Sequence, residues 1–384
     1  MDIQVSPFPA VLAATGNVDG ERVPPYRVFI RTSGFAAGHG GERRMRAAVL
    51  RATGEIRVEE AEQPVPGAGE ALVEMRAVGL CGSDLAAFRG RHPFRSAPVV
   101  LGHEGAGRVA RPAPGGRLPA GERVAIMPLL SCWECPRCES GLAHLCARRR
   151  VPGAGWEGML GGFLPVPERA LFPLAAHLSY AEGALTEPAA VAWHTVRTAG
   201  VGPGQRVAVL GAGTIGTLVA AVCRLHHVAE LVVSDVRPRS LAVAARLADC
   251  HTVNAAREDV VTAARPLGGA EGFDAVVLAS GHPGGLDEAL ALCRPRGTVV
   301  LLPMFGEPVT ADLNPVVLRE ITVRGSTVYT SADFRAAAEA VNGGTLDVGR
   351  LIDAEPLPLA RTQAAFEELA RGTESMKILV DPAR

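Results

Sequence analysis

The stretch Arg206-Val-Ala-Val-Leu-Gly-Ala-Gly-Thr-Ile-Gly216 decides the fold, because an apolar run leads directly into glycines spaced G-x-G-x-x-G. Its first five residues predict a buried strand, and the residues from Ile215 to His226 predict a helix. Glycines at these positions let the backbone turn tightly and approach a pyrophosphate that rests on the helix N-terminus. The stretch therefore predicts a dinucleotide site formed by Gly211, Gly213, Ile215 and Gly216.

An acidic residue further along the chain strengthens this prediction. Asp235 ends the next expected strand, 19 residues after Gly216, where its carboxylate can bond the ribose hydroxyls of adenosine. The alternative is a glycine turn in an unrelated α/β protein, which would need neither the preceding strand nor the acid. Because a carboxylate repels a 2′-phosphate, we expect NAD rather than NADP, although Arg237 and Arg239 weaken that preference.

The chain after the motif alternates between strand and helix patterns. Strands are predicted at 230–234, 273–279 and 298–302, with helical segments such as 240–248 between them. Strands and helices that alternate at this spacing form a parallel sheet with crossover helices. The sequence thus predicts an α/β protein with a doubly wound parallel sheet of the Rossmann type. Residues 46 to about 190 differ, since they are rich in glycine and proline and predict only short strands.

Composition limits what this chain can be. At 384 residues it is long enough for two domains, and 48% hydrophobic with 21% charged residues is typical of a globular protein. The formal net charge of −1 gives no basic excess for nucleic acid or an anionic membrane, and no apolar run approaches ~18 residues. We therefore expect neither a nucleic-acid partner nor a membrane partner. The N-terminus lacks a basic n-region and its apolar run is short, so we expect a cytoplasmic protein.

Residues 1–44 differ from the rest of the chain, since they carry scattered prolines and glycine clusters without a sustained period. The strand pattern begins abruptly at Met45. The residues Gly40-Gly41-Glu42 would be encoded by a purine-rich run, as a ribosome-binding site would be. Two interpretations stay open: a disordered extension, or a translation start that in fact lies at Met45.

Four of the eight cysteines crowd into one short segment with the spacing C-x2-C-x2-C-x7-C. In a long chain with no export signal, such a cluster indicates metal binding rather than disulfides, and this spacing disfavours four unrelated free thiols. Four thiolates can surround one tetrahedral Zn²⁺, and such a closed site has no open position for substrate. The segment predicts a structural zinc held by Cys132, Cys135, Cys138 and Cys146.

A second set of possible ligands is dispersed along the chain: Cys81-Gly-Ser83-Asp84, Gly102-His103-Glu104-Gly105 and Glu187-Pro188, with His194 seven residues on. Thiolate, imidazole and carboxylate together can hold a zinc that keeps one coordination position open for substrate. Each residue alone has a simpler explanation, as a buried small residue, a loop histidine or an acid at a helix start.

Taken together, these motifs resemble the zinc-dependent medium-chain alcohol dehydrogenases, in particular the branch of the sorbitol, 2,3-butanediol and threonine dehydrogenases. The resemblance covers about residues 45–384 and includes further pieces in the family's order: Pro98-Val-Val-Leu-Gly-His103-Glu, Gly121-Glu-Arg-Val124, Gly161-Gly-Phe163 and Lys377-Ile-Leu-Val-Asp-Pro382. It implies a mainly-β, GroES-like catalytic domain at 45–192 and 327–384. A Rossmann NAD-binding domain at 193–326 would be inserted between these two segments.

The resemblance also implies roles for single residues. Cys81, His103 and Glu104 would lie on or near the catalytic zinc, and Glu187 would ligate it directly or through water. Ser83, two residues after a ligand, would begin the proton relay. The expected catalytic residues are therefore Ser83, Glu104 and Glu187.

Two departures from the family bear on the mechanism and the substrate. The family often has a histidine five residues after the ligand cysteine to finish the relay, and this chain has Ala86 there. The polyol-binding arginine of sorbitol dehydrogenases aligns near Val328, which disfavours a close sorbitol enzyme.

The chemistry that follows is hydride transfer. A zinc ion acts as a Lewis acid on the alcohol oxygen, and hydride leaves carbon for the nicotinamide ring. We expect a homodimer or homotetramer with two zinc ions per chain, which oxidises a secondary alcohol of a small diol, polyol or cyclitol to a ketone, or runs the reverse reaction. One alternative is an amino-alcohol dehydrogenase, either threonine-like or acting on an aminocyclitol such as 2-deoxy-scyllo-inosamine. The non-enzymatic alternative is a redox sensor that binds zinc and a dinucleotide.

Overall fold

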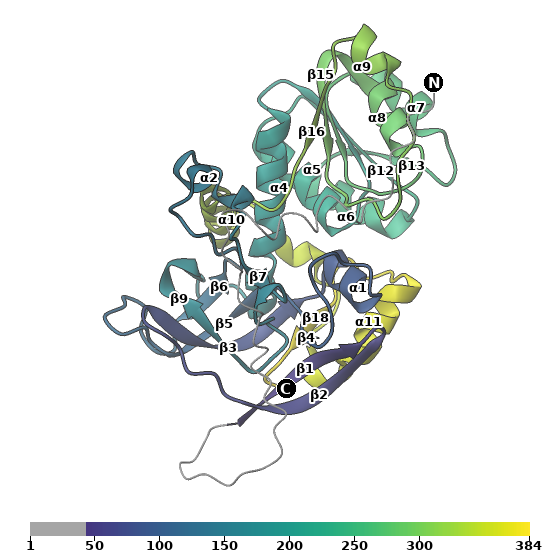
Figure 1. Ribbon diagram of the computed structural model, residues 1–384. Coiled ribbons are helices and arrows are strands. Elements are labelled where there is room, and N and C mark those ends of the chain that lie inside the picture. The colour runs from purple at the N-terminus through teal and green to yellow at the C-terminus, as the bar shows by residue number, and fades with distance from the viewer. Residues whose placement is uncertain (1–43) are drawn as a thin grey trace, which may run out of the picture.

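The computed structural model describes residues 44–384, which form two lobes (Figure 1). The two interpretations of residues 1–44 lie outside the described residues, apart from Arg44, which begins the first strand.

Six parallel strands form one sheet in the upper lobe of Figure 1, in the order β13-β12-β11-β14-β15-β16. Chain order runs outward in both directions from the central pair β11 and β14, so the prediction of a doubly wound sheet is confirmed. Such sheets bind ligands at the carboxyl ends of the strands where the order reverses. The strands are β11 (Arg206–Leu210), β12 (Glu230–Asp235), β13 (His251–Asn254), β14 (Phe273–Leu278), β15 (Cys293–Leu301) and β16 (Thr322–Gly325).

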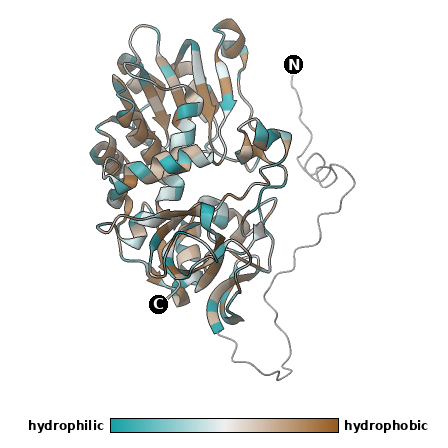
Figure 2. Ribbon diagram, turned by 90° about the vertical axis from the view of Figure 1, so that its left-hand side faces the viewer, coloured by the Kyte–Doolittle hydropathy of each residue, from teal (hydrophilic) through white to brown (hydrophobic). Residues whose placement is uncertain are grey.

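Helices cover both faces of this sheet because its central strands are apolar on both sides, as Figure 2 shows by colour. Val207 and Val209 of β11 lie in one core, whereas Ala208 and Leu210 lie in the other. The first core includes α4, α5 and α6 and continues into the lower lobe, while α7 and α8 complete the second. The helices are α4 (Thr186–Ala199), α5 (Thr214–Leu225), α6 (Pro238–Ala248), α7 (Val260–Ala264), η4 (Arg265–Gly268), α8 (Gly285–Leu292) and α9 (Asn314–Leu318).

The lower lobe consists mainly of β-strands. A seven-stranded sheet has the order β10-β6-β5-β3-β18-β17 with β9 paired to β3, and two smaller sheets have the orders β2-β1-β4 and β7-β8. Strand β18 pairs antiparallel with β3, so segments from both ends of the described chain build this lobe. Its strands are β1 (Arg44–Ala52), β2 (Glu55–Glu62), β3 (Glu70–Gly79), β4 (Val99–Val100), β5 (Glu104–Arg111), β6 (Arg123–Ile126), β7 (Val151–Pro152), β8 (Gly155–Trp156), β9 (Phe163–Pro167), β10 (Leu171–Pro173), β17 (Leu357–Pro358) and β18 (Leu379–Asp381).

Short helices fill the edges of the lower lobe: α1 (Gly82–Phe88), α2 (Pro136–Glu139), η2 (Ala143–Leu145), η3 (Glu168–Ala170), α3 (Tyr180–Ala184), α10 (Ser331–Asn342), η5 (Val348–Leu351), η6 (Leu359–Arg361) and α11 (Thr362–Arg371). Helix α4 joins the two lobes and ends at Gly200, whose φ of +68° makes a left-handed cap. The border expected at 192/193 falls inside this single helix, and the domain borders stay a prediction. Within residues 44–384, no helix is both long enough and apolar enough to cross a membrane.

Candidate active site

The glycine loop lies between the carboxyl end of β11 and the start of α5, beside the end of β14. A side chain at Gly216 would overlap the carbonyl oxygen of Gly211, and one at Gly211 would meet Ser280. Gly213, the N-cap of α5, faces open space instead, and Ile215 follows in the first turn. Two glycines are therefore required by packing, while the third leaves the backbone accessible at the helix N-terminus, as a bound pyrophosphate requires.

Asp235 ends β12 beside this loop. Its Oδ2 accepts a hydrogen bond of 2.7 Å from the backbone N–H of Ala212, and its Oδ1 accepts one of 2.8 Å from the N–H of Arg237. The carboxylate is thus fixed between the glycine loop and the start of α6, on the side where the sequence predicts an adenosine ribose. These residues fit the pyrophosphate and the adenosine ribose of a dinucleotide cofactor.

The four clustered cysteines converge around one point. Their Sγ atoms lie 3.4–3.9 Å apart along four edges of the cluster. A tetrahedral zinc with Zn–S bonds of about 2.3 Å requires sulfur atoms about 3.8 Å apart, so the cluster fits one zinc ion. It is closed on all four sides by the predicted ligands Cys132, Cys135, Cys138 and Cys146.

The segment that carries the four cysteines packs against α4 through two histidines. The ring of His144, from η2 between two of the cysteines, lies edge-on at 4.8 Å from the ring of His194 on α4. His194 in turn lies 2.9 Å from Asp333 Oδ2, which caps α10. His194 therefore joins the helix packing, and it does not belong to a group of possible metal ligands.

The second group of possible metal ligands is Cys81, His103 and Glu104, whose ligand atoms lie within 4.8 Å of one another. Cys81 is the N-cap of α1, and His103 precedes β5, which begins at Glu104. His103 and Glu104 are buried and Cys81 is half-buried. One thiolate, one imidazole and one carboxylate suit a zinc site with an open position.

Asp84 holds this group together and was not predicted to be a site residue. Its Oδ1 lies 3.2 Å from His103 Nδ1, and its Oδ2 accepts from the N–H of Cys81 at 3.3 Å. Burial alone would raise the pKa of Asp84, but His103 and Arg95 hold it well below the usual range. A carboxylate on the far nitrogen of a ligand histidine fixes the ring for metal binding. The sequence feature that could have identified Asp84 is an acidic residue three positions after the ligand cysteine Cys81.

Glu104 is paired with the only lysine of the chain. Both of its oxygens accept from Lys377 Nζ, at 2.9 and 2.6 Å, and Lys377 also donates to the carbonyl of Leu80. Burial would lower the pKa of Lys377, but Glu104 and Cys81 raise it above its usual value. The ion pair thus gives each of these two buried groups a charged partner, and only the fold brings them together across 273 positions.

Glu187 lies outside the group formed by Cys81, His103 and Glu104. It is in the first turn of α4, where its Oε1 accepts a 2.9 Å hydrogen bond from the buried hydroxyl of Tyr329. Burial raises the pKa of Glu187 to about 7, although the nearby His103 lowers it. Val328, before this tyrosine, has a φ of +46°, which is strained for a β-branched residue. Such strain is concentrated at functional sites.

Ser83 lies in the first turn of α1, and its Oγ accepts a 3.0 Å hydrogen bond from Arg95 Nη1. The same guanidinium nitrogen lies 3.2 Å from Asp84 Oδ1, and the arginine side chain is buried. No sequence pattern predicts this contact, because Arg95 lies in an irregular loop.

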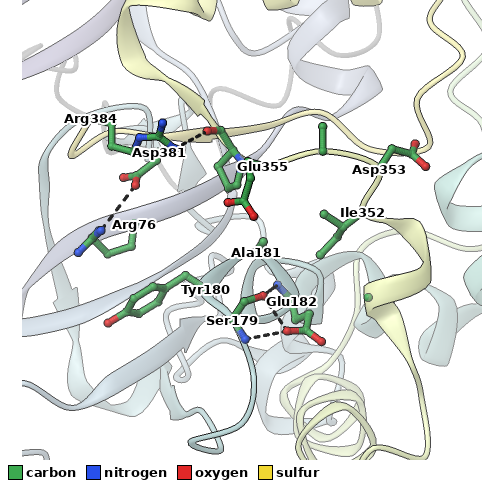
Figure 3. Close-up of a pocket in the computed structure, with 13 residues that line it drawn as sticks. Arg76, Ser179, Tyr180, Ala181, Glu182, Ile352, Asp353, Glu355, Asp381 and Arg384 are labelled. Carbon is green, nitrogen blue, oxygen red and sulfur yellow. Dashed lines mark hydrogen bonds and ion pairs between the residues drawn. The ribbon is translucent and has the colours of Figure 1, made fainter.

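A separate cavity of about 630 Å³ opens on the lower lobe, between α3 and the chain's last residues. Figure 3 shows its mixed charges, including the ion pair of Arg76 with Asp381, and it contains none of the residues predicted to bind metal or dinucleotide. We therefore do not assign the reaction to this cavity.

Comparison with known proteins agrees with this geometry. Residues 67–176 match the alcohol dehydrogenase GroES-like domain, and residues 214–343 match the zinc-binding dehydrogenase domain. A 2-dehydro-3-deoxy-L-galactonate 5-dehydrogenase of Pseudoalteromonas atlantica is 32% identical over 84% of this chain and 95% of its own. The L-galactonate-5-dehydrogenase of Escherichia coli K12 is 32% identical over 78% of this chain and 87% of its own.

Solved structures agree as well. A crystal structure described as a zinc-binding dehydrogenase from Sinorhizobium meliloti 1021, bound to NADP, superposes with a TM-score of 0.81 at 30% identity. The match covers 89% of this chain and all of that one. The expected GroES-like and Rossmann combination is thereby confirmed.

Proposed function

Because the chain belongs to the zinc-dependent medium-chain alcohol dehydrogenases, we propose that it transfers hydride between NAD(H) and a secondary alcohol of a small polyhydroxylated substrate. The observation that carries this proposal is the group Cys81, His103 and Glu104, gathered within 4.8 Å beside Ser83. The substrate class comprises diols, polyols and cyclitols, and the two relatives named above extend it to sugar acids.

The residues of the site have different roles. Cys81, His103 and Glu104 hold the catalytic zinc, with Glu187 close by as an exchangeable ligand, and Asp84 fixes the His103 ring. When bound, zinc polarises the alcohol oxygen and NAD accepts the hydride. The four clustered cysteines hold a second, structural zinc.

Ser83 exchanges the proton of the substrate hydroxyl. Arg95 donates to its Oγ, so the serine's own proton is free to point toward another acceptor. Arginine carries no acceptor and cannot receive the proton, and Ala86 offers none. In this proposal water or a cofactor hydroxyl carries the proton away from Ser83.

A panel of substrates tests the proposal. Purified, zinc-loaded protein is assayed for NADH formation with polyols, cyclitols, sugar acids, threonine and aminocyclitols. Turnover with a polyol or sugar acid supports the proposal, and exclusive turnover of amino alcohols replaces it with the amino-alcohol alternative. Tight NADH binding with no turnover of any alcohol favours the redox sensor.

Ser83→Ala is expected to lower kcat by roughly 10²-fold or more, because the substrate proton loses its first acceptor. Zinc content and NADH affinity should stay unchanged, since Ser83 binds neither group. Arg95→Lys keeps a positive charge near Asp84 but loses the rigid fork that reaches Ser83, and a smaller loss of kcat, about tenfold, is expected. Wild-type kcat in Ser83→Ala would refute its part in proton transfer.

We also propose that the enzyme is a homodimer or homotetramer. Strand β16 is an edge strand of the described sheet, with apolar side chains exposed beside it: Val323 is 38% exposed, Val317 75% and Leu318 81%. An apolar patch at an open sheet edge suits pairing with a second copy.

Size-exclusion chromatography coupled to light scattering should therefore give the molar mass of two or four chains. Val317→Asp combined with Leu318→Asp should shift it to one chain, because charges would be buried in the interface. Glu307→Gln serves as a control at a polar surface position in the same lobe. A monomeric wild type at micromolar concentration would contradict the proposal.

We place the enzyme in the cytoplasm, because a zinc site of four thiolates requires reduced cysteines. Cell fractionation with detection of the native chain tests this placement, and recovery from an oxidising compartment would overturn it.

A further inference from the structure

We propose that Asp353, a residue of the lower lobe, sets cofactor choice by holding Arg239 away from the adenosine ribose. The inference rests on the proposed NAD-dependent function and adds a second carboxylate to Asp235. Asp353 follows η5 and lies 118 positions after Asp235 in sequence, in a different lobe. It acts through Arg239 and is thus a positioning residue.

The start of α6 is where a 2′-phosphate would lie. Arg237 is the N-cap of this eleven-residue helix, and its N–H donates to Asp235, so the helix N-terminus faces the ribose side of the site. Arg237 and Arg239 both lie at this end of α6, Arg237 as the N-cap and Arg239 in the first turn. Arginine pairs strongly with phosphate, and a helix N-terminus favours it further. By these features alone the site would suit NADP as well as NAD.

In the structure Arg239 is paired away from the ribose side, and Arg237 is shared between Asp235 and a partner in the lower lobe. Arg239 Nη2 lies 2.6 Å from Asp353 Oδ1, and Arg237 Nη1 donates to the carbonyl oxygen of Thr373 at 3.2 Å. Both partners belong to the lower lobe. The Arg239 guanidinium is therefore directed across the lobe interface, whereas that of Arg237 also lies 3.5 Å from Asp235 Oδ1 through its Nε.

Asp353 is itself held in place. Its Oδ2 accepts a 2.7 Å hydrogen bond from the N–H of Met376, so each of its oxygens has one partner. The carbonyl of Met376 accepts from Thr214 Oγ1 at the start of α5. The segment that fixes Asp353 thus also contacts the helix on which the pyrophosphate would rest. This contact ties the position of the Arg239–Asp353 pair to that of the cofactor site.

Asp353 also lies at the edge of the cavity in Figure 3, apart from the ion pair of Arg76 with Asp381. Replacing it by asparagine keeps its shape and leaves that ion pair in place. Asparagine can still accept from Met376 but no longer carries the charge that holds Arg239. Glu355, two residues on in the same loop, supplies a matched control.

The experiment compares wild type, Asp353→Asn, Arg239→Gln, the double variant and Glu355→Gln. Fluorescence titration gives Kd for NADPH and NADH, and kcat/KM is measured with NADP and NAD. Asp353→Asn should raise the NADPH:NADH affinity ratio roughly tenfold, because a freed guanidinium can pair with the 2′-phosphate. The double variant and Glu355→Gln should both keep the wild-type ratio.

An unchanged ratio in Asp353→Asn overturns the inference, as does a gain that survives in the double variant. If the ion pair only fastened the lobes together, both affinities would change by the same factor, which also overturns it. Failure of the proposed function is seen separately, as absence of alcohol turnover in wild type, while the binding ratios still decide the role of Asp353.

Discussion

Cys81→Ala is expected to lose the catalytic metal and nearly all turnover while NADH binding stays intact. The thiolate is the softest, charged donor of the group Cys81, His103 and Glu104, and its loss leaves two ligands that cannot retain zinc in an open site. The dinucleotide loop lies in the other lobe, so its geometry does not depend on this cysteine. His103→Ala should behave in the same way.

Three measurements separate these effects: zinc content by elemental analysis, NADH affinity by fluorescence, and steady-state rates. We expect zinc to fall from two to one per chain and kcat to fall by about 10³-fold or more. Cys223→Ala, which removes a buried thiol on α5, is the matched control and should keep both zinc ions. Wild-type rates in Cys81→Ala would refute metal-assisted hydride transfer in this protein.

Cys135→Ser is expected to lower the stability of the fold and to leave the catalytic rate of the folded protein unchanged. Structural zinc can contribute on the order of 10 kcal/mol to folding, and the short cysteine segment has only a few buried apolar side chains of its own. We expect Tm to fall by about 10 °C or more and the protein to become less soluble. The loss should spread to α4, because His144 packs on His194 there.

Thermal unfolding and zinc content test this expectation, with Cys250→Ser as the control for loss of a single half-buried thiol outside the cluster. Residual activity per folded, catalytically loaded molecule should remain close to wild type. Two zinc ions and an unchanged Tm in Cys135→Ser would show that the four cysteines do not form a structural site.

The sequence by itself determined the features whose partners are near one another along the chain. The glycine motif lies between its own strand and helix. Within that turn, Gly211 has a φ of +112°, and a side chain at Gly216 would overlap the carbonyl oxygen of Gly211. The four cysteines span fifteen positions, so their spacing already predicts one tetrahedral site. Alternating strand and helix patterns likewise predicted the parallel sheet, because each pattern records which faces of one element are buried.

Only the tertiary structure decided how the catalytic residues are partnered. Lys377 pairs with Glu104 across 273 positions, Tyr329 bonds Glu187 across 142, and Asp353 holds Arg239 across 114. The hydrophobic periodicity of the sequence does not predict such contacts, because it depends only on the strand or helix to which each residue belongs. From the sequence alone, Lys377 has no assigned partner and Arg239 could bind a phosphate. Tertiary packing gives each of them its carboxylate partner. A buried charge such as that of Lys377 or Glu104 requires an opposite partner, and this packing decides which partner that is.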